Sequence, residues 1–338
     1  MPWMELSLNT KHEAVDWICT LLAETHYTGD IQITQYIDPA LQRGSDCNWV
    51  QPDWVFTIVL YLPWDGRVRE RVEKIDQLLL PLHRVGLATE LEAAIVEEKT
   101  TFPAAANLLI RRIGQRLVVL GADTLYQSET ANEITIRLGT TLCFGSGFHP
   151  ATIVNLRLLE RYVVPAMQVL DLGSGSGILS VAMAKLEAEV LAIDNDPIAV
   201  QATQDAVNQN GVDQRVTVMA GSLGQGSNLG HWMGGTMTDQ TPSITPQSSF
   251  DLIAANILAR VHIALASDFQ RALRRTESHP GLLIISGFTT DQEDEVNSAL
   301  TAAGFEAIDE ERFDQWVALA YRLKAELTFS PRLKAGDS

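Results

Sequence analysis

The chain of 338 residues has few cysteines, no long apolar run and a deficit of basic residues. Its three cysteines, Cys19, Cys47 and Cys143, are scattered, and none lies beside a histidine at metal-ligand spacing, which argues against a disulfide framework and against a metal site. Apolar stretches such as Leu282 to Ile285 fall far short of the roughly 20 residues that a membrane helix needs. The first residues lack the basic and apolar segments of a secretion signal. We therefore expect a cytoplasmic protein with reduced thiols, no metal and no membrane contact.

Acidic residues outnumber basic ones by 42 to 25, which gives a formal net charge of −17. A surface of this sign repels phosphate and gains nothing from counterion release, so direct binding to nucleic acid is not expected. A basic protein partner would be attracted to it, although acidity also serves solubility alone. Hydrophobic residues make up 46% of the chain, which is enough to build the cores of two domains at this length.

The first hundred residues predict a ferredoxin-like α+β domain. Alternation of apolar and polar residues predicts strands, and apolar residues at helical spacing predict helices, in the order strand, helix, strand, twice over. This pattern assigns residues 1–100 to one domain, a common platform for contact with protein or RNA. The predicted elements are Trp3–Leu8, His12–Glu24, Ile31–Ile37, Trp54–Leu62, Arg67–Leu82 and Leu87–Val96.

Residues 101–130 are predicted to connect this domain to a second one, with a helix over Phe102 to Ile113 and a short strand over Leu117 to Leu120. In residues 131–327 strands alternate with helices, which predicts an α/β domain whose mostly parallel sheet is covered by helices on both faces. Its last two strands are joined by a short turn and must be antiparallel. The seven predicted strands are Val169–Leu172, Val190–Ile193, Val216–Met219, Leu252–Ala255, Leu282–Ser286, Ala307–Arg312 and Trp316–Leu323. The polar segments 224–249 and 328–338 are predicted to be a mobile insertion and a flexible tail.

A glycine-rich loop follows the first strand of this predicted sheet. Gly173, Gly175 and Gly177 let the backbone approach a ligand closely. A dinucleotide fingerprint would need its third glycine where Ile178 stands, one residue later, so the spacing favours a nucleoside sulfonium over a pyrophosphate. The loop therefore favours S-adenosylmethionine as the ligand.

The next strand ends at Asp194, at the edge where open parallel sheets bind their ligands. A carboxylate there can accept hydrogen bonds from both ribose hydroxyls of a nucleoside. The alternative is that the carboxylate caps the following helix, but Asp196, just before Pro197, is better spaced for capping. Asp194 is the candidate ribose ligand.

Asn256 leaves the fourth strand in the segment Ala255-Asn256-Ile257-Leu258 and is the candidate catalytic residue. Its side-chain carbonyl can accept a hydrogen bond from a substrate amine and hold the nitrogen lone pair toward a methyl group. Taken alone, a turn or capping role before the next helix is equally compatible.

The segment from Phe144 to Thr152 precedes the sheet and predicts a lid. Its small residues and Pro150 at a helix start expose backbone N–H groups and the Thr152 hydroxyl near the cofactor. His149 within it is expected to pack or cap rather than act as a general base.

These segments, in this order, resemble the ribosomal protein L11 methyltransferases of the PrmA type. The resemblance extends to the start, Trp3 to Thr10, and to the closing hairpin, Gly304 to Tyr321. It implies a class I, Rossmann-like methyltransferase domain and an N-terminal domain that recognises the substrate. It further implies transfer of methyl groups from S-adenosylmethionine to lysine and/or N-terminal amines of a ribosomal protein. We expect the chain to act as a monomer. The residues that the resemblance places against the cofactor or the amine are Thr152, Gly173, Asp194 and Asn256.

The sequence departs from this family at Ser146 and Ala151, which replace threonines, and at Phe102 to Ala104, where the family carries a tryptophan-rich segment. A class I methyltransferase for another protein or a small-molecule amine stays open. A nucleic-acid methyltransferase would carry an Asn-Pro-Pro-aromatic turn, which Ile257 and Leu258 replace here. An oxidoreductase is disfavoured by the position of the third glycine, and a non-catalytic protein by the intact Asp194 and Asn256.

Overall fold

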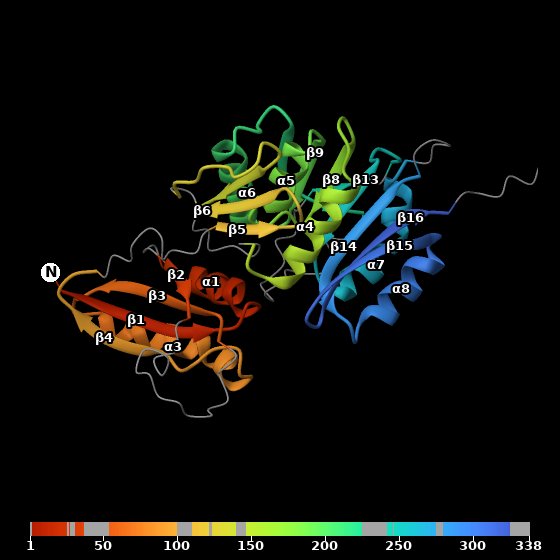
Figure 1. The fold of residues 1–338 in the computed structure, drawn as a ribbon. Helices are drawn as coiled ribbons and strands as arrows, with labels where there is room; N and C mark the ends of the chain where they lie inside the picture. The colour runs from red at the N-terminus through yellow and green to blue at the C-terminus, as the bar shows by residue number, and fades with distance from the viewer. Residues whose placement is uncertain are drawn as a thin grey trace, which may run out of the picture.

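The computed structural model describes residues 2–25, 27, 31–36, 54–99, 110–121, 124–139, 147–224, 242–245, 247–274 and 280–324. The N-terminal residues form one sheet with its helices, and the C-terminal half forms a larger sheet with helices around it (Figure 1). A small third sheet lies between them in the sequence.

The N-terminal sheet has the order β2-β3-β1-β4, and each neighbouring pair is antiparallel. This order confirms the ferredoxin-like pattern. Leu6 and Leu8 of β1 point into a core with Val15 and Ile18 of the first helix, because alternate strand residues face the same side. Cys19 is buried in that core, whereas Cys47 and Cys143 lie outside the described residues. The elements are β1 (Trp3–Thr10), α1 (Ala14–Glu24), β2 (Ile31–Gln35), β3 (Phe56–Pro63), α3 (Val68–Arg84) and β4 (Glu92–Val96).

The connecting segment supplies β5 (Ile110–Ile113) and β6 (Leu117–Gly121) of the small sheet, and its third strand, β7 (Ile134–Leu138), lies beyond residue 130, in the segment assigned to the second domain. β5 pairs with β6 antiparallel, and β6 pairs with β7 parallel. The helix predicted over Phe102 to Ile113 is wrong at residues 110–113, because pairing with the fully buried strand β6 overrides the helical spacing. The rest of that predicted helix lies outside the described residues.

The large sheet has the order β10-β9-β8-β13-β14-β16-β15. Its first five strands are parallel, and β16 runs antiparallel between β14 and β15. The predicted seven strands and terminal hairpin are confirmed. The strands are β8 (Gln168–Leu172), β9 (Glu189–Asp194), β10 (Val216–Ala220), β13 (Leu252–Asn256), β14 (Leu282–Thr289), β15 (Phe305–Phe313) and β16 (Trp316–Leu323). The helices are α4 (Pro150–Tyr162), α5 (Ile178–Lys185), α6 (Pro197–Gln209), α7 (Ala259–Ala272) and α8 (Glu293–Ala302).

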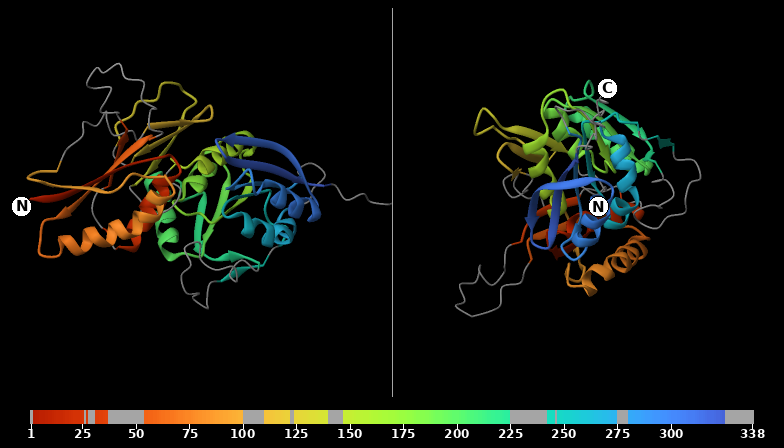
Figure 2. Two further views of the ribbon diagram at one scale, coloured as in Figure 1. Left: turned by 90° about the horizontal axis from the view of Figure 1, so that it is seen from below. Right: turned by 90° about the vertical axis from the view of Figure 1, so that its right-hand side faces the viewer.

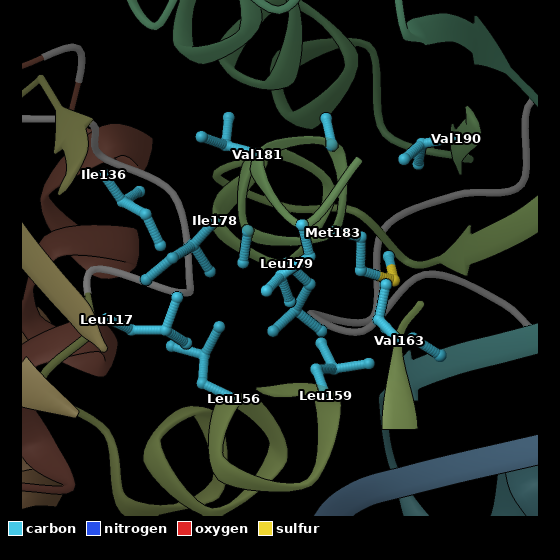
Figure 3. Packing of buried hydrophobic residues seen from close by; sticks show 14 of the residues in the cluster. Leu117, Ile136, Leu156, Leu159, Val163, Ile178, Leu179, Val181, Met183 and Val190 are labelled. Carbon is cyan, nitrogen blue, oxygen red and sulfur yellow. The ribbon is translucent and has the colours of Figure 1, made fainter. Parts of the chain in front are cut away.

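Helices cover both faces of the large sheet, and strand alternation divides the core between them. Leu252 and Ala254 of β13 pack in the cluster that holds α4, α5 and α6, whereas Ile253 and Ala255 pack in the cluster that holds α7 and α8. Leu156 and Leu159 of α4 point toward α5 in the first of these clusters (Figure 3).

Most of the predicted insertion, residues 225–241 and 246, lies outside the described residues, as does the predicted tail. Near the end of the insertion, strand β12 (Ser243–Ile244) pairs in parallel with β11 (Ser222–Leu223), which precedes the insertion. Ile244 packs against the α7 side of the core. No helix among the described residues is long and apolar enough to cross a membrane.

The N-terminal sheet and the large sheet stand side by side (Figure 2) and share direct contacts. Phe148, just before α4, packs in the core of the N-terminal sheet, with its ring centroid 4.9 Å from that of Phe56. The Glu13 carboxylate accepts hydrogen bonds from Trp316 Nε1 at 2.9 Å and from Gln315 Nε2 at 3.1 Å. The N-terminal part of the chain therefore contacts both the segment that leads into α4 and the terminal hairpin.

Candidate active site

The predicted site residues gather at the carboxyl edge of the large sheet. β9, β8, β13 and β14 are parallel neighbours, so the segments that leave their carboxyl ends meet. These segments carry Asp194, the glycine loop, Asn256 and Ser286.

The glycine loop needs glycine for its conformation and for its close contacts. Gly173, Gly175 and Gly177 all have positive φ, at 75°, 55° and 80°. A Cβ on Gly173 would come within 2.6 Å of the Ile257 side chain, and a Cβ on Gly177 within 2.9 Å of the Thr203 backbone. The loop therefore lies directly against the turn that follows β13 and against α6.

Helix α6 fixes the loop through Thr203, which the sequence analysis did not single out. The Thr203 hydroxyl donates to the Gly175 carbonyl at 3.1 Å, so its 2.8 Å contact with Ser174 Oγ must be one in which it accepts. A buried threonine on the inner face of a helix gives no sequence signal, because β-branched residues there usually serve packing.

Asp194 ends β9 with both carboxylate oxygens engaged by backbone. Gly175 N donates to one oxygen at 2.9 Å and Asp196 N to the other at 3.0 Å. Burial raises the pKa of Asp194, while these backbone hydrogen bonds lower it. Asp196 caps α6 by accepting from Ile198 N at 2.9 Å, which confirms its predicted role. Asp194 is therefore not needed as the N-cap of α6.

Asp171 lies at the end of β8 and is fully buried. Ser180 donates to its Oδ2, and its Oδ1 has no hydrogen-bond partner among the described residues. Burial above all, with the nearby charge of Asp194, raises the pKa of Asp171 to about 7. An unsatisfied buried carboxylate oxygen suits a cationic ligand. The site therefore fits a positively charged sulfonium nucleoside.

His149 is the N-cap of α4, as the sequence analysis expected of it. Its Nδ1 accepts from Ala151 N at 3.1 Å and therefore carries no proton. Burial lowers the pKa of His149 to about 3, so it stays neutral at neutral pH. Of the predicted lid, residues 147–152 are described, and residues 144–146 lie outside the described residues.

Asn256 contacts Thr152 of the lid helix through its side-chain amide. Its Nδ2 donates to Thr152 Oγ1 at 3.1 Å, and its Oδ1 accepts from Ser286 Oγ at 3.0 Å. Ser286 Oγ in turn accepts from Asn155 Nδ2 at 2.8 Å. Thr152, Asn155 and Ser286 are all fully buried, whereas Asn256 is only partly buried.

The sequence analysis did not identify Ser286 and Asn155 as site residues, although the sequence contains a feature that points to each of them. Asn256 and Ser286 are direct register partners on neighbouring strands, and each is the polar residue that ends an apolar run. Asn155 stands three residues after Thr152, which puts both on one face of α4. The strand order had to be known before these residues could be associated.

The arrangement brings the six predicted residues into one continuous site at the carboxyl edge. Gly175 contacts Asp194, Gly173 faces the turn after Asn256, and Asn256 contacts Thr152. Among the described residues, no group of acidic, histidine and cysteine side chains could hold a metal ion. With the strand order of the large sheet, this site defines a class I S-adenosylmethionine-dependent methyltransferase.

Comparison with known proteins narrows the class to a family. A family model described as ribosomal protein L11 methyltransferase (PrmA) matches residues 2–324. The ribosomal protein L11 methyltransferase of Chloroflexus aurantiacus is 38% identical over 95% of this chain and 98% of its own length. That of Herpetosiphon aurantiacus is 35% identical over 95% of this chain and 99% of its own.

A solved structure agrees with the sequence relatives. The crystal structure of a ribosomal protein L11 methylase from Lactobacillus delbrueckii subsp. bulgaricus matches with a TM-score of 0.52 and 27% identity, over 64% of this chain and 99% of that chain. The chain belongs to the ribosomal protein L11 methyltransferase (PrmA) family.

Proposed function

We propose that this chain transfers methyl groups from S-adenosylmethionine to lysine and/or N-terminal amines of ribosomal protein L11. The observation that carries the proposal is the position of Asn256. A partly exposed amide stands beside the glycine loop, and buried neighbours hold it on two sides. The names of the relatives support the identity of the protein substrate.

We assign the cofactor to the residues that line this edge. Asp194 would accept hydrogen bonds from the ribose, the glycine loop would lie against the nucleoside, and Thr152 would close the site from the lid helix. When bound, the cofactor supplies a methyl group on a positively charged sulfonium. Asp171 would favour that charge from below the loop, because its buried Oδ1 is still unsatisfied among the described residues.

Asn256 would act on the amine by orientation. Its Oδ1 keeps a second lone pair that can accept an amine N–H and so direct the nitrogen lone pair. The amine must be neutral to react, starting from a reference pKa of about 10.4 for lysine or about 7.7 for an α-amine. His149, with a pKa of about 3, is too weak a base to take that proton. The proton therefore leaves to solvent.

We propose that the chain divides its work among its segments. Residues 1–100 present the substrate, residues 101–130 connect, residues 131–327 carry out the transfer, and residues 328–338 form a tail. The contact of Phe148 with the N-terminal core supports this division, because it joins the proposed docking domain to the lid helix. The net charge of −17 favours a basic ribosomal protein as the partner. We propose that the chain acts as a monomer, because one chain supplies every proposed ligand. We also propose that it acts in the cytoplasm.

The test mixes the purified chain with labelled S-adenosylmethionine and unmodified large-subunit ribosomal proteins. Label is expected on L11, and mass analysis of its peptides would give the amines that are modified. The Asn256→Ala variant serves as the control for background transfer. Transfer to another protein, or to a small-molecule amine alone, would replace L11 as the substrate, and no transfer at all would refute the proposed activity.

A further inference from the structure

Ser286 is joined to the turn around Asn256 by more than one hydrogen bond. Its carbonyl accepts from Ile257 N at 3.1 Å and is 2.8 Å from His262 Nε2. Since a carbonyl only accepts, the ring nitrogen carries the proton. The Ser286 hydroxyl also donates to Asn256 Oδ1. Backbone and side chain of one residue therefore both hold this turn.

The backbone at Ser286 has an irregular form that creates these contacts. The register between β14 and β16 shifts between Ile285 and Phe288, which marks a bulge at residues 286 and 287. Gly287 has φ 95°, and a Cβ there would come within 2.4 Å of the Ile257 carbonyl oxygen. The bulge and its glycine allow β14 to approach the Asn256 turn more closely than a regular strand with side chains could.

The hydrogen bonds around Ser286 have a single consistent direction. Asn155 Nδ2 donates to the Ser286 hydroxyl, and the hydroxyl proton then goes to Asn256 Oδ1. If the Asn256 amide alone were rotated by half a turn, its NH2 would face the Ser286 hydroxyl, and that hydroxyl would lose the Oδ1 acceptor to which it now donates. Because all the partners are buried, that loss would carry a full desolvation cost.

We propose that Ser286 and Asn155 are positioning residues that fix the orientation of the Asn256 amide. They present Oδ1, rather than NH2, to the substrate amine. Neither residue touches the reacting atoms, since both are fully buried. The inference rests on the proposed function, because it gives the amide orientation a purpose in amine methylation.

Steady-state kinetics provide the first test. Ser286→Ala removes the hydroxyl, and Asn155→Leu removes the donor while keeping a similar volume. Each is expected to lower kcat about fivefold, the worth of one neutral hydrogen bond, with KM and cofactor affinity within about twofold of wild type. Ser286→Cys keeps a weak donor and should fall between wild type and Ser286→Ala.

A matched control separates positioning from general loss of stability. Asn210 caps the far end of α6, accepts from Arg137 N at 2.8 Å and donates to Ala206 O at 2.8 Å. Asn210→Ala removes an amide with comparable hydrogen bonds at the opposite edge of the sheet. It is expected to lower the melting temperature and to leave kcat unchanged.

A double-mutant cycle makes the test specific to Asn256. In an Asn256→Ala background, Ser286→Ala should cause no further fall in residual kcat, because the group to be oriented is already absent. A purely structural role predicts the same fivefold fall in both backgrounds, and that result would overturn the proposal.

A spectroscopic measurement tests the orientation without cofactor or substrate. In protein labelled with ¹⁵N at asparagine, the side-chain NH2 signal of Asn256 is identified by its absence in Asn256→Ala. It is expected to shift, and its protons to exchange faster with water, in both Ser286→Ala and Asn155→Leu, but not in Asn210→Ala. An unchanged signal in both variants would overturn the proposal. If wild type methylates nothing but the signal shifts as expected, the proposed function fails while the positioning stands.

Discussion

Replacement of Asp194 by alanine tests the proposed ribose ligand most directly. The two Asp194 oxygens already accept Gly175 N and Asp196 N, at 2.9 and 3.0 Å. A carboxylate offers about four lone-pair positions, and the backbone of Asn195 also acts on this one, so at least one position remains for a ribose hydroxyl. The backbone bonds hold the carboxylate in place before the ligand arrives, which reduces the ordering cost of binding.

The expected loss of affinity follows from the charge on the acceptor. Hydrogen bonds to a charged group contribute about 1.5–3 kcal/mol. Asp194→Ala should therefore raise the Kd for cofactor by about 10- to 150-fold. Asp196→Ala is the matched control, because it removes a neighbouring carboxylate that only caps α6. It should cost about 1 kcal/mol of stability and leave the Kd near the wild-type value.

Calorimetric titration with S-adenosylhomocysteine and with its 2′-deoxy analogue separates a lost ligand contact from a disturbed loop. Wild type should bind the deoxy analogue more weakly, and Asp194→Ala should bind both alike. If Asp194→Ala still discriminates against the analogue as strongly as wild type does, another group holds the ribose and the assignment is wrong.

Three further predictions follow from the same site. Asn256→Ala should lower kcat by at least tenfold while the Kd for cofactor, measured by titration, stays within about twofold; near-normal turnover would leave Asn256 a structural turn residue. Cofactor binding near pH 7 should release protons, because a cationic ligand favours ionised Asp171, whose pKa burial raises to about 7; titration in buffers of different ionisation enthalpy measures this release, and Asp171→Asn should abolish it. Burial lowers the pKa of His262 to about 4, so only the unfolded chain takes up its proton as pH falls from 6.5 toward 4. Urea unfolding at pH 7 and pH 5 should therefore show a loss of about 2 kcal/mol from His262. That loss should be absent in His262→Gln, which keeps a donor for Ser286.

Strand and helix order were predictable from the sequence because hydrophobic periodicity is strong in both halves. The glycine loop was also predictable, since positive φ and close approach demand glycine at Gly173 and Gly177. The helix prediction is wrong at residues 110–113 for a physical reason. Ile110 and Ile113 have the spacing of one helix face, but all four residues of this segment pair with β6. The spacing of apolar residues within a segment does not show which strand the segment will pair with.

The supporting residues could not be predicted, because their roles depend on register. Thr203 reaches the glycine loop only through the packing of α6, and Asn155 reaches Ser286 only because α4 lies across β14. Single polar residues in buried elements have many possible partners. The sequence therefore predicts which residues face the ligand and leaves open which residues hold them.

Asn256 shows why this second group matters for the chemistry. Its motif alone is equally compatible with a catalytic and a structural role, because an asparagine after a strand serves either one. In the structure it does not cap α7, whose N-cap is Leu258, and its amide is instead engaged by Thr152 and Ser286. A residue kept only for a turn would bond to local backbone, whereas these partners come from helix α4 and strand β14. In the proposed mechanism these long-range hydrogen bonds fix the rotation of a partly buried amide, and a fixed acceptor is what a substrate amine requires.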